Sequence, residues 1–146
     1  HVLSAGRFFI IDKGEDDGVR PGNIVTFKNI LIGKIVSVTN RTSRVLTPIE
    51  EDSIISAKAG KTGARGLVKG QADRMLFSEV TLSENLTEKD TVMTIGDVDE
   101  KGLGVRPDLL IGTLTAIRKG DDQLFQEATV VPLLDYKALQ NVFVVL

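Results

Sequence analysis

The side chains that most often carry nucleophilic catalysis are scarce in this sequence. It has 146 residues, no cysteine, and a single histidine, His1, at its very start. Ser-His-Asp and Cys-His mechanisms both need a histidine that a third group holds beside the nucleophile. A histidine at a free end is poorly placed for that role, so we predict no catalytic residue of either kind. The lack of cysteine also excludes disulfides and thiolate metal sites.

Gly60-Lys61-Thr62 has the residue types that end a phosphate-binding loop. Such a loop needs a further glycine five residues before Gly60, where this sequence has Ile55, and a helix directly after the threonine. Gly63, Gly66 and Gly70 follow instead, and glycine is unfavourable in a helix. A β-turn between two strands fits these residues better than a phosphate site.

Two groups of carboxylates, Glu50-Glu51-Asp52 and Asp97-Asp99-Glu100, have the ligand type that calcium prefers. Neither has the spacing of an EF-hand loop, with its glycine at the sixth position and glutamate at the twelfth. We therefore expect solvated loops, no metal ion and no cofactor. A glycosidase would need two carboxylates at a set separation in a cleft. Such a pair stays open, although the chain has no tryptophan and one tyrosine for stacking sugar rings.

The composition predicts a globular region whose main partner is not nucleic acid. Hydrophobic residues make up 42% of the chain and charged residues 26%, and the formal net charge is −2. This content allows a packed core, whereas phosphate binding needs a concentrated basic face. The longest apolar runs, at residues 8–11 and 142–146, are far too short to cross a bilayer, and no signal peptide is present. Because the chain starts without methionine, we interpret it as an excised fragment.

Any site must be positioned by β-strands, because segments rich in Val, Ile, Leu, Thr and Phe alternate with clusters of turn-forming residues. Residues 33–38 carry apolar side chains on both faces, which is typical of a strand covered on both sides at a barrel seam. One short helix is predicted at residues 135–140, capped by Asp135, with Leu139 toward the core. Strands are predicted at residues 7–11, 24–27, 30–38, 45–47, 54–58, 64–68, 74–80, 91–95, 109–117, 124–131 and 142–145. Many short strands at this spacing favour a sandwich or a barrel.

The sequence contains one internal repeat. Gly18-Val19-Arg20-Pro21 recurs as Gly104-Val105-Arg106-Pro107, and residues 32–38 are echoed by residues 111–117. We interpret each Gly-x-x-Pro element as a turn into a strand, and the glycine within each later strand as a bulge or a close backbone approach. The repeat predicts two β-subdomains of related construction. Coincidence between common turn tetrapeptides is the alternative, and the shared downstream strand weighs against it.

Segments along nearly the whole chain, in order, resemble the bacterial rod shape-determining MreC family. They are residues 11–22, 31–36, 42–46, 62–70, 107–117, 130–132 and 139–145. For example, Thr42-Ser43-Arg44-Val45 is similar to the family's Thr-Ser-Arg-Val, and Thr62 to Gly66 to its Thr-Gly-x-Arg-Gly. The chain departs from the pattern at residues 93–100, where the family has Thr-Ser-Gly and more glycines. It departs again at Asp108, where the family has a glycine after Pro107.

This resemblance implies an all-β fold of two small six-stranded β-barrels packed together outside the cytoplasmic membrane. We expect the first barrel in residues 1–58 and the second in residues 59–146, with the C-terminal strand, residues 142–145, available to complete either barrel. The implied function is a non-catalytic scaffold of cell-wall elongation that associates with itself. The implied partners are the elongation transpeptidase (a class B penicillin-binding protein), MreD and the MreB system, with a membrane helix and a coiled coil outside this chain.

Two other classes of function stay open at this point. One is a secreted β-barrel enzyme, either a degenerate trypsin-like protease or a carbohydrate-active enzyme, which would need a cleft with convergent polar groups. The other is a barrel that binds a small molecule, which would need an interior pocket.

Four side chains are candidates for a partner interface. Phe27 stands beside the Lys28-Asn29 turn and is expected to be partly exposed. Arg20 and Arg106 follow the paired turns, and arginine is enriched at protein interfaces. Asp108, at the departure from the family pattern, completes the set. A solvated side chain is the alternative for each residue taken alone.

Overall fold

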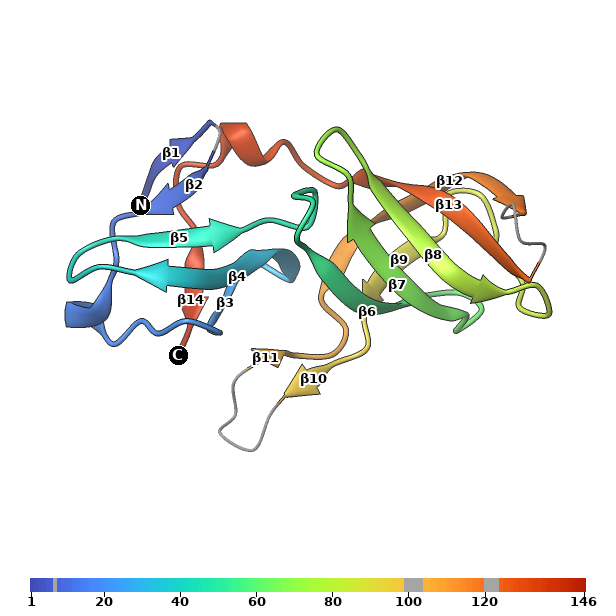
Figure 1. The fold of residues 1–146 in the computed structure, drawn as a ribbon, viewed down its shortest axis with the longest axis horizontal. Coiled ribbons are helices and arrows are strands. Elements are labelled where there is room, and N and C mark those ends of the chain that lie inside the picture. The colour runs from blue at the N-terminus through green and yellow to red at the C-terminus, as the bar shows by residue number, and fades with distance from the viewer. Residues whose placement is uncertain (7, 99–103, 120–123) are drawn as a thin grey trace.

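The computed structural model describes residues 1–6, 8–98, 104–119 and 124–146, and within them the fold is all-β, as predicted (Figure 1). The strands are β1 (Val2–Ala5), β2 (Phe9–Ile11), β3 (Ile24–Phe27), β4 (Ile30–Val38), β5 (Ser43–Leu46), β6 (Ile54–Ala59), β7 (Arg65–Gly70), β8 (Met75–Thr81), β9 (Thr91–Thr94), β10 (Asp97–Val98), β11 (Gly104–Val105), β12 (Leu110–Lys119), β13 (Phe125–Pro132) and β14 (Phe143–Val145). Two short 3-10 turns, η1 (Glu15–Asp17) and η2 (Tyr136–Ala138), interrupt them. Among the described residues no helix is long and apolar enough to cross a membrane.

Six strands form a closed barrel in the order β6-β7-β8-β13-β12-β9, because β9 pairs with β6 as well as with β12. This ring is the right-hand lobe of Figure 1. Inward-facing side chains alternate along each strand and fill the interior. Phe77, Met75, Val68 and Ile111 are all fully buried in this core.

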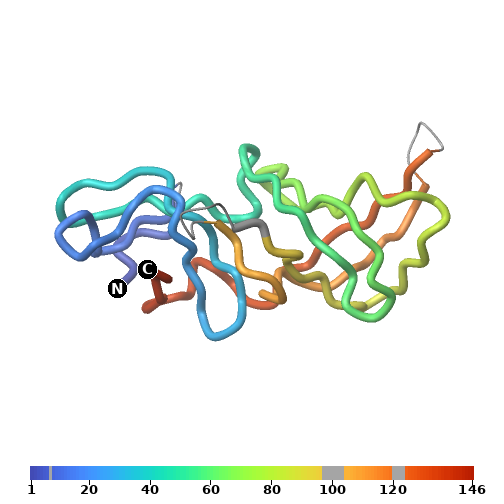
Figure 2. The backbone as a smooth tube through the Cα atoms, turned by 90° about the horizontal axis from the view of Figure 1, so that it is seen from below, coloured from blue at the N-terminus to red at the C-terminus, as the bar shows by residue number. Residues whose placement is uncertain are grey.

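The other six strands, in the order β1-β2-β5-β4-β3-β14, curl around a second core that includes Ile11, Val25 and Ile35. The C-terminal strand β14 pairs antiparallel with β3 from early in the chain, so both termini lie at this barrel (Figure 2). The backbone N–H of Val2 in β1 donates to the carbonyl of Gln140, in the segment that precedes β14, at 2.8 Å. The division into residues 1–58 and 59–146 remains a proposal. The pairing of β14 with β3 fits completion of the first barrel by the C-terminal strand. Strand β6, which this boundary would cut, pairs with β7 and β9 of the other barrel.

The two barrels are joined where β4 runs parallel to β12, with Ile30 opposite Leu110. The N–H of Leu110 donates to the carbonyl of Asn29 at 2.8 Å. Successive side chains of a strand point to opposite faces. Leu31 therefore enters the core of the β6-to-β13 barrel, whereas Ile32 enters the core of the other. The strand is covered on both sides at the seam, as predicted, but at residues 31–32 rather than 33–38.

The downstream part of the predicted repeat, residues 32–38 and 111–117, falls on equivalent strands of the two barrels, β4 and β12. Gly33 of β4 lies opposite Val25 of β3, and Gly112 of β12 lies opposite Val92 of β9. In both barrels the ladder with the next strand shifts register further along, between Ile35 and Ser37 of β4 and between Thr115 and Arg118 of β12.

The first half of the predicted repeat is wrong. Residues 18–21 precede β3, whereas residues 104–107 follow β9, the strand equivalent to β3. In one barrel the connection after β3 is the tight Lys28-Asn29 turn, but in the other the connection after β9 is long and carries the β10–β11 pair. The two Gly-Val-Arg-Pro segments are therefore structurally unrelated: residues 18–21 lead from η1 into β3, whereas residues 104–107 form β11 and the start of the turn toward β12.

Local predictions differ from the structure in a few places. The predicted helix is only the single turn η2, although Asp135 does cap it by accepting a hydrogen bond from the N–H of Lys137 at 3.0 Å. Leu139 packs against the core, as expected. Strands β1, β10 and β11 and the turn η1 were not predicted because each spans only two to four residues. Arg7, the predicted start of the first strand, lies outside the described residues.

Candidate partner interface

Phe27 ends β3 beside the seam between the barrels. Its ring is half-buried and packs against the core around Ile35, and the ammonium of Lys28 lies 5.6 Å from its centroid. A cation at this distance over an aromatic face is attracted to it. Lys28 adopts a positive φ of 56° to close the turn, and the next residue, Asn29, accepts the hydrogen bond from Leu110. Phe27 therefore lies at a fixed part of the surface.

Arg106 and Asp108 lie on the connection that leads from β11 into β12, and both are exposed. Thr94, which is fully buried, holds this connection in place. Its hydroxyl donates to the carbonyl of Arg106 and accepts from the N–H of Leu109 at 3.0 Å, and its carbonyl accepts from the N–H of Asp108 at 2.9 Å. A surface segment thus has a buried polar anchor.

Asp108 adopts a φ of 65°, in the left-handed region that favours glycine. This conformation accounts for the glycine that the family pattern has after Pro107. Aspartate tolerates the left-handed region better than most residues. Its carboxylate also forms an ion pair with Lys58 at 2.9 Å, although the Asp108 side chain is 65% exposed and the pair is correspondingly weak.

Arg20 lies apart from the other three candidates. It is exposed on the turn before β3, where its backbone N–H donates to the side-chain oxygen of Asn23 at 2.7 Å. Phe27 is the last residue of β3, at the end of the strand away from Arg20. The structure therefore brings Phe27, Arg106 and Asp108 to the region of the seam, and it does not bring Arg20 there.

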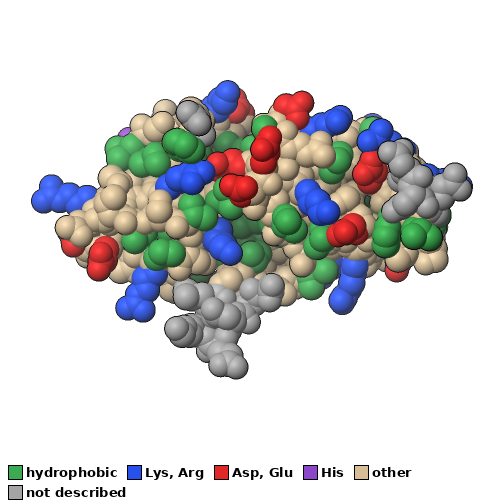
Figure 3. Space-filling view, in the orientation of Figure 1, with side chains coloured by type: hydrophobic (Ala, Val, Ile, Leu, Met, Phe, Trp, Pro, Cys, Tyr) green, Lys and Arg blue, Asp and Glu red, His purple; other side chains and the backbone are tan. Residues whose placement is uncertain are grey.

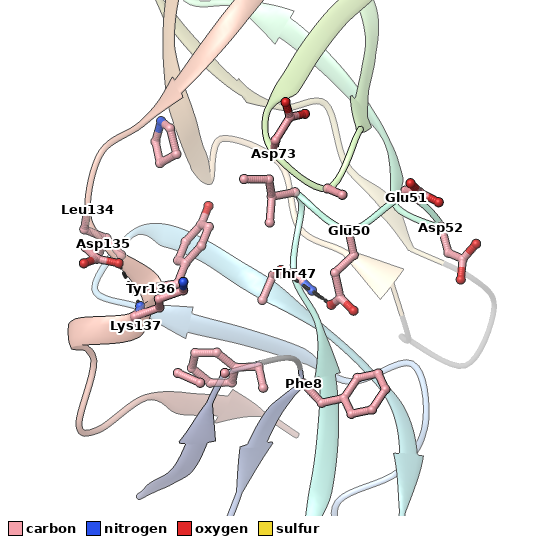
Figure 4. A pocket seen from close by; sticks show the side chains of 16 residues that line it. Phe8, Thr47, Glu50, Glu51, Asp52, Asp73, Leu134, Asp135, Tyr136 and Lys137 are labelled. Atoms are coloured by element: carbon pink, nitrogen blue, oxygen red, sulfur yellow. Dashed lines mark hydrogen bonds between the residues drawn. The ribbon is translucent and has the colours of Figure 1, made fainter.

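A groove between the two barrels was not predicted from the sequence. Its volume is about 820 Å³, and it is formed by the β1–β2, β5–β6 and β7–β8 connections and by the segment from β13 into η2 (Figure 4). Phe9, Ile49, Pro132 and Leu134 contribute apolar lining. The carboxylates at its rim are those of Glu50, Glu51, Asp52, Asp73 and Asp135. Because four separate connections contribute, no local motif could have revealed this groove.

One wall of the groove is built around Arg44. Its guanidinium stacks 4.4 Å from the centroid of the Phe8 ring and forms an ion pair with Glu50 at 3.0 Å. The second carboxylate oxygen of Glu50 accepts a hydrogen bond from the N–H of Thr47 at 2.7 Å. Both carboxylate oxygens of Glu50 are therefore engaged in holding the β5–β6 connection, and Glu50 is not available to bind another molecule.

Tyr136 of η2 forms part of the opposite wall (Figure 4). Burial raises the pKa of its phenol to about 12. Its hydroxyl oxygen is shielded from solvent and has no hydrogen-bond partner within the described part of the chain. A phenol in this state is neutral at physiological pH and contributes chiefly its ring to packing.

The motifs first examined for chemistry have structural roles. Residues 60–63 form the turn of the β6–β7 hairpin, as predicted, and the N–H of Lys61 donates to the Asp90 carboxylate at 3.1 Å. In residues 1–6, 8–98, 104–119 and 124–146 no group of three acidic, histidine or cysteine side chains could hold a metal. Asp99 and Glu100 of the second carboxylate group lie outside these ranges. The terminal ammonium of His1 bonds Asp12 at 2.7 Å and lowers the pKa of that carboxyl.

Fold and surface together define a tandem β-barrel protein with two barrels joined edge to edge and a groove between them. A family model described as the barrel core of the rod shape-determining protein MreC matches residues 4–146. The cell shape-determining protein MreC of Listeria monocytogenes is 31% identical over 140 residues, which are 92% of this chain and 46% of that protein. The chain belongs to the MreC family and corresponds to its barrel core. It spans about half the length of this curated relative.

Solved structures have the same fold. The crystal structure of MreC from Pseudomonas aeruginosa matches with a TM-score of 0.87 at 22% identity, covering 99% of this chain and 96% of that one. A structure of the major periplasmic domain from the cell shape-determining filament MreC matches with a TM-score of 0.71 at 21% identity, covering 92% of this chain and 85% of that one. A complex between the penicillin-binding protein PBP2 and MreC from Helicobacter pylori gives 0.67 at 18% identity, covering 86% and 79%.

Proposed function

We propose that this chain acts outside the cytoplasmic membrane as a non-catalytic scaffold of cell-wall elongation, where it binds the elongation transpeptidase, a class B penicillin-binding protein. Family membership over residues 4–146 is the observation that carries the proposal. The likeness of fold to an MreC solved with PBP2, and to an MreC periplasmic domain, supports the partner and the location. MreD, the MreB system and further copies of the chain are proposed as additional partners, with a membrane helix outside this chain as the anchor.

Phe27, Arg106 and Asp108 are proposed to contribute to the transpeptidase contact. They lie near the seam, where the Asn29–Leu110 hydrogen bond and the buried hydroxyl of Thr94 hold the backbone rigid. A preorganised surface loses little conformational entropy on binding. An aromatic ring flanked by an arginine also matches the composition of protein interfaces. Arg20, at the far end of β3, would belong to a separate contact.

A barrel that binds a small molecule inside is less well supported. The interiors of both barrels are filled by fully buried side chains, among them Phe77 in one and Ile35 in the other. Six-stranded barrels of this size are normally filled in this way. The described groove lies between the barrels and is open to solvent at their junction, which suits a protein partner better.

Surface plasmon resonance against the ectodomain of an elongation transpeptidase tests this proposal. We expect saturable binding that Phe27→Ala and Arg106→Ala each weaken by about tenfold, as for side chains near the centre of an interface. Arg41→Ala, an exposed arginine in the turn between β4 and β5, and Phe143→Ala, 64% exposed on β14, are matched controls. Far-ultraviolet circular dichroism confirms that each variant is folded. Absence of binding by the folded wild-type chain at high micromolar concentration contradicts the proposal.

A further inference from the structure

We infer that the groove between the barrels binds an extended segment of a partner protein in which lysine or arginine alternates with aliphatic or aromatic side chains. This inference rests on the proposed scaffold function and adds a second docking surface to it. The groove lies on the η2 side of the junction in Figure 1, whereas β11, next to Arg106, lies on the opposite side. The two surfaces can therefore be occupied independently.

The lining of the groove offers apolar contacts that the chain itself does not cover. Ile49, Pro132 and Leu134 are only partly buried along the groove, and Pro132 and Leu134 line the side that leads into η2. Phe8 leaves 42% of its side chain exposed at the mouth, with the Arg44 guanidinium stacked against its ring. Exposed apolar surface bounded by polar groups is typical of protein interaction sites.

The charge of the rim selects the kind of segment. Glu50 is paired with Arg44, and the Asp135 carboxylate accepts the backbone N–H of Lys137. The exposed ammonium of Lys137 is the one positive charge among the described lining residues. Three further carboxylates, those of Glu51, Asp52 and Asp73, are exposed and form no ion pair within the part of the chain that the structure describes. Figure 3 shows acidic side chains gathered near the junction of the two barrels, next to hydrophobic and basic side chains. A basic segment would meet a complementary potential there, and an acidic one would be repelled.

The walls of the groove are already in place. The N–H of Ala72, in the β7–β8 turn, donates to the carbonyl of Ile49 at 2.8 Å. Gly70 at the start of this turn packs directly on the carbonyl of Glu50, so closely that a Cβ atom would overlap it. These contacts fasten the tip of one barrel onto the β5–β6 connection. A segment can therefore bind without first reorganising the groove, which lowers the entropic cost of association.

The inference is tested by titrating the ¹⁵N-labelled chain with short fluorescein-labelled peptides. The first peptide alternates leucine and lysine, the second replaces each lysine by glutamate, and the third replaces each leucine by serine. We expect saturable binding of the leucine–lysine peptide, with amide chemical-shift changes centred on Ala72, Asp73 and Leu134. Both other peptides should bind at least about tenfold more weakly, because each lacks one of the two complementary properties.

Paired charge reversals supply the matched control. Glu51→Lys with Asp73→Lys should weaken binding of the leucine–lysine peptide by about tenfold. Glu15→Lys with Glu84→Lys changes the net charge equally at exposed positions outside the groove, and it should leave the affinity unchanged. Equal weakening by both pairs, or shift changes centred away from the groove, overturns the inference. So does sedimentation that shows a dimer of the free chain which Glu51→Lys with Asp73→Lys dissociates, because the groove would then be covered by a second copy.

Binding of the transpeptidase ectodomain, measured in parallel, separates this inference from the proposed function. Ectodomain binding without peptide binding in the groove overturns the inference and leaves the proposed function standing. Peptide binding in the groove without ectodomain binding supports the inference and overturns the choice of partner.

Discussion

Gly33 of β4 and Gly112 of β12 occupy equivalent positions in the two barrels. A Cβ atom on Gly33 would overlap the carbonyl oxygen of Leu46 and a methyl group of Val45, and one on Gly112 would overlap the carbonyl oxygen of Val131 and a methyl group of Val130. Each strand thus passes so close to its neighbour that only a hydrogen fits between them. Each barrel therefore has the same kind of close-packed corner. The parallel β4–β12 contact joins the two strands that form these corners.

Replacing either glycine should destabilise its barrel. Gly33→Ala and Gly112→Ala are each expected to lower the free energy of unfolding by about 3 kcal/mol, because the overlapping atoms are backbone and can yield only by shifting a strand. Guanidinium denaturation followed by circular dichroism measures the loss. Gly6→Ala, whose new Cβ would be 4.0 Å from its nearest neighbour, is the control. Equal stability of Gly33→Ala and Gly6→Ala would show that the corner is not close-packed.

Thr94 is expected to be the anchor of the Arg106–Asp108 segment. Thr94→Val keeps the shape but removes the hydroxyl, leaving the carbonyl of Arg106 and the N–H of Leu109 without a partner. A loss of about 2 kcal/mol in unfolding free energy is expected. Faster hydrogen exchange at Leu109 would show where the loss arises. Thr94→Ser retains the hydroxyl and should keep Leu109 protected; if it exchanges as fast as Thr94→Val, the hydroxyl is not the anchor.

Asp108 gives a test of the left-handed backbone. An L-residue with a side chain costs about 1 kcal/mol in this conformation, and an exposed ion pair such as that with Lys58 contributes about 0.5 kcal/mol or less. Asp108→Gly should therefore raise the unfolding free energy by about 0.5 kcal/mol. Asp108→Val should lower it by about 1–2 kcal/mol, because a β-branched residue fits this region worst. Thermal unfolding of both variants checks the prediction, and the reverse order would contradict the observed φ.

Tyr136 links pH to stability. Burial raises its pKa from 10.0 to about 12, so ionisation favours the unfolded chain. The stabilising contribution of the neutral phenol is complete below pH 10, and it is lost as the pH rises from 10 to 12. The chain has one tyrosine and no tryptophan, so absorbance at 295 nm reports this group alone. We expect a titration midpoint near 12 in the folded chain and near 10 in urea. A midpoint near 10 in both would contradict its burial.

Much of the fold could be predicted from the sequence, because strand periodicity is local. The segment 30–38 was predicted to its last residue, and Gly33 and Gly112 marked the close approaches. The Gly-Val-Arg-Pro repeat misled because a turn tetrapeptide does not specify which strands it connects.

The groove could not be predicted from the sequence, because it is assembled from segments that are far apart in the chain. Phe8, Glu51, Asp73 and Tyr136 come from four connections, and each looks like an ordinary surface or core residue in its own segment. They meet only because β4 and β12 dock the barrels side by side. Of the interface candidates, Phe27 and the Arg106–Asp108 segment approach the seam for the same reason, and their role in binding stays a prediction.

Hydrogen–deuterium exchange of the chain, with and without the ectodomain of the elongation transpeptidase, tests the scaffold function most directly. We predict slower exchange in the complex at residues 27–30 and 104–110, on both sides of the seam. Exchange at the buried centre of β8 should not change, since it is already protected in the free chain. Identical exchange everywhere, at ectodomain concentrations that saturate a full-length relative, would contradict the claim that this region holds the transpeptidase.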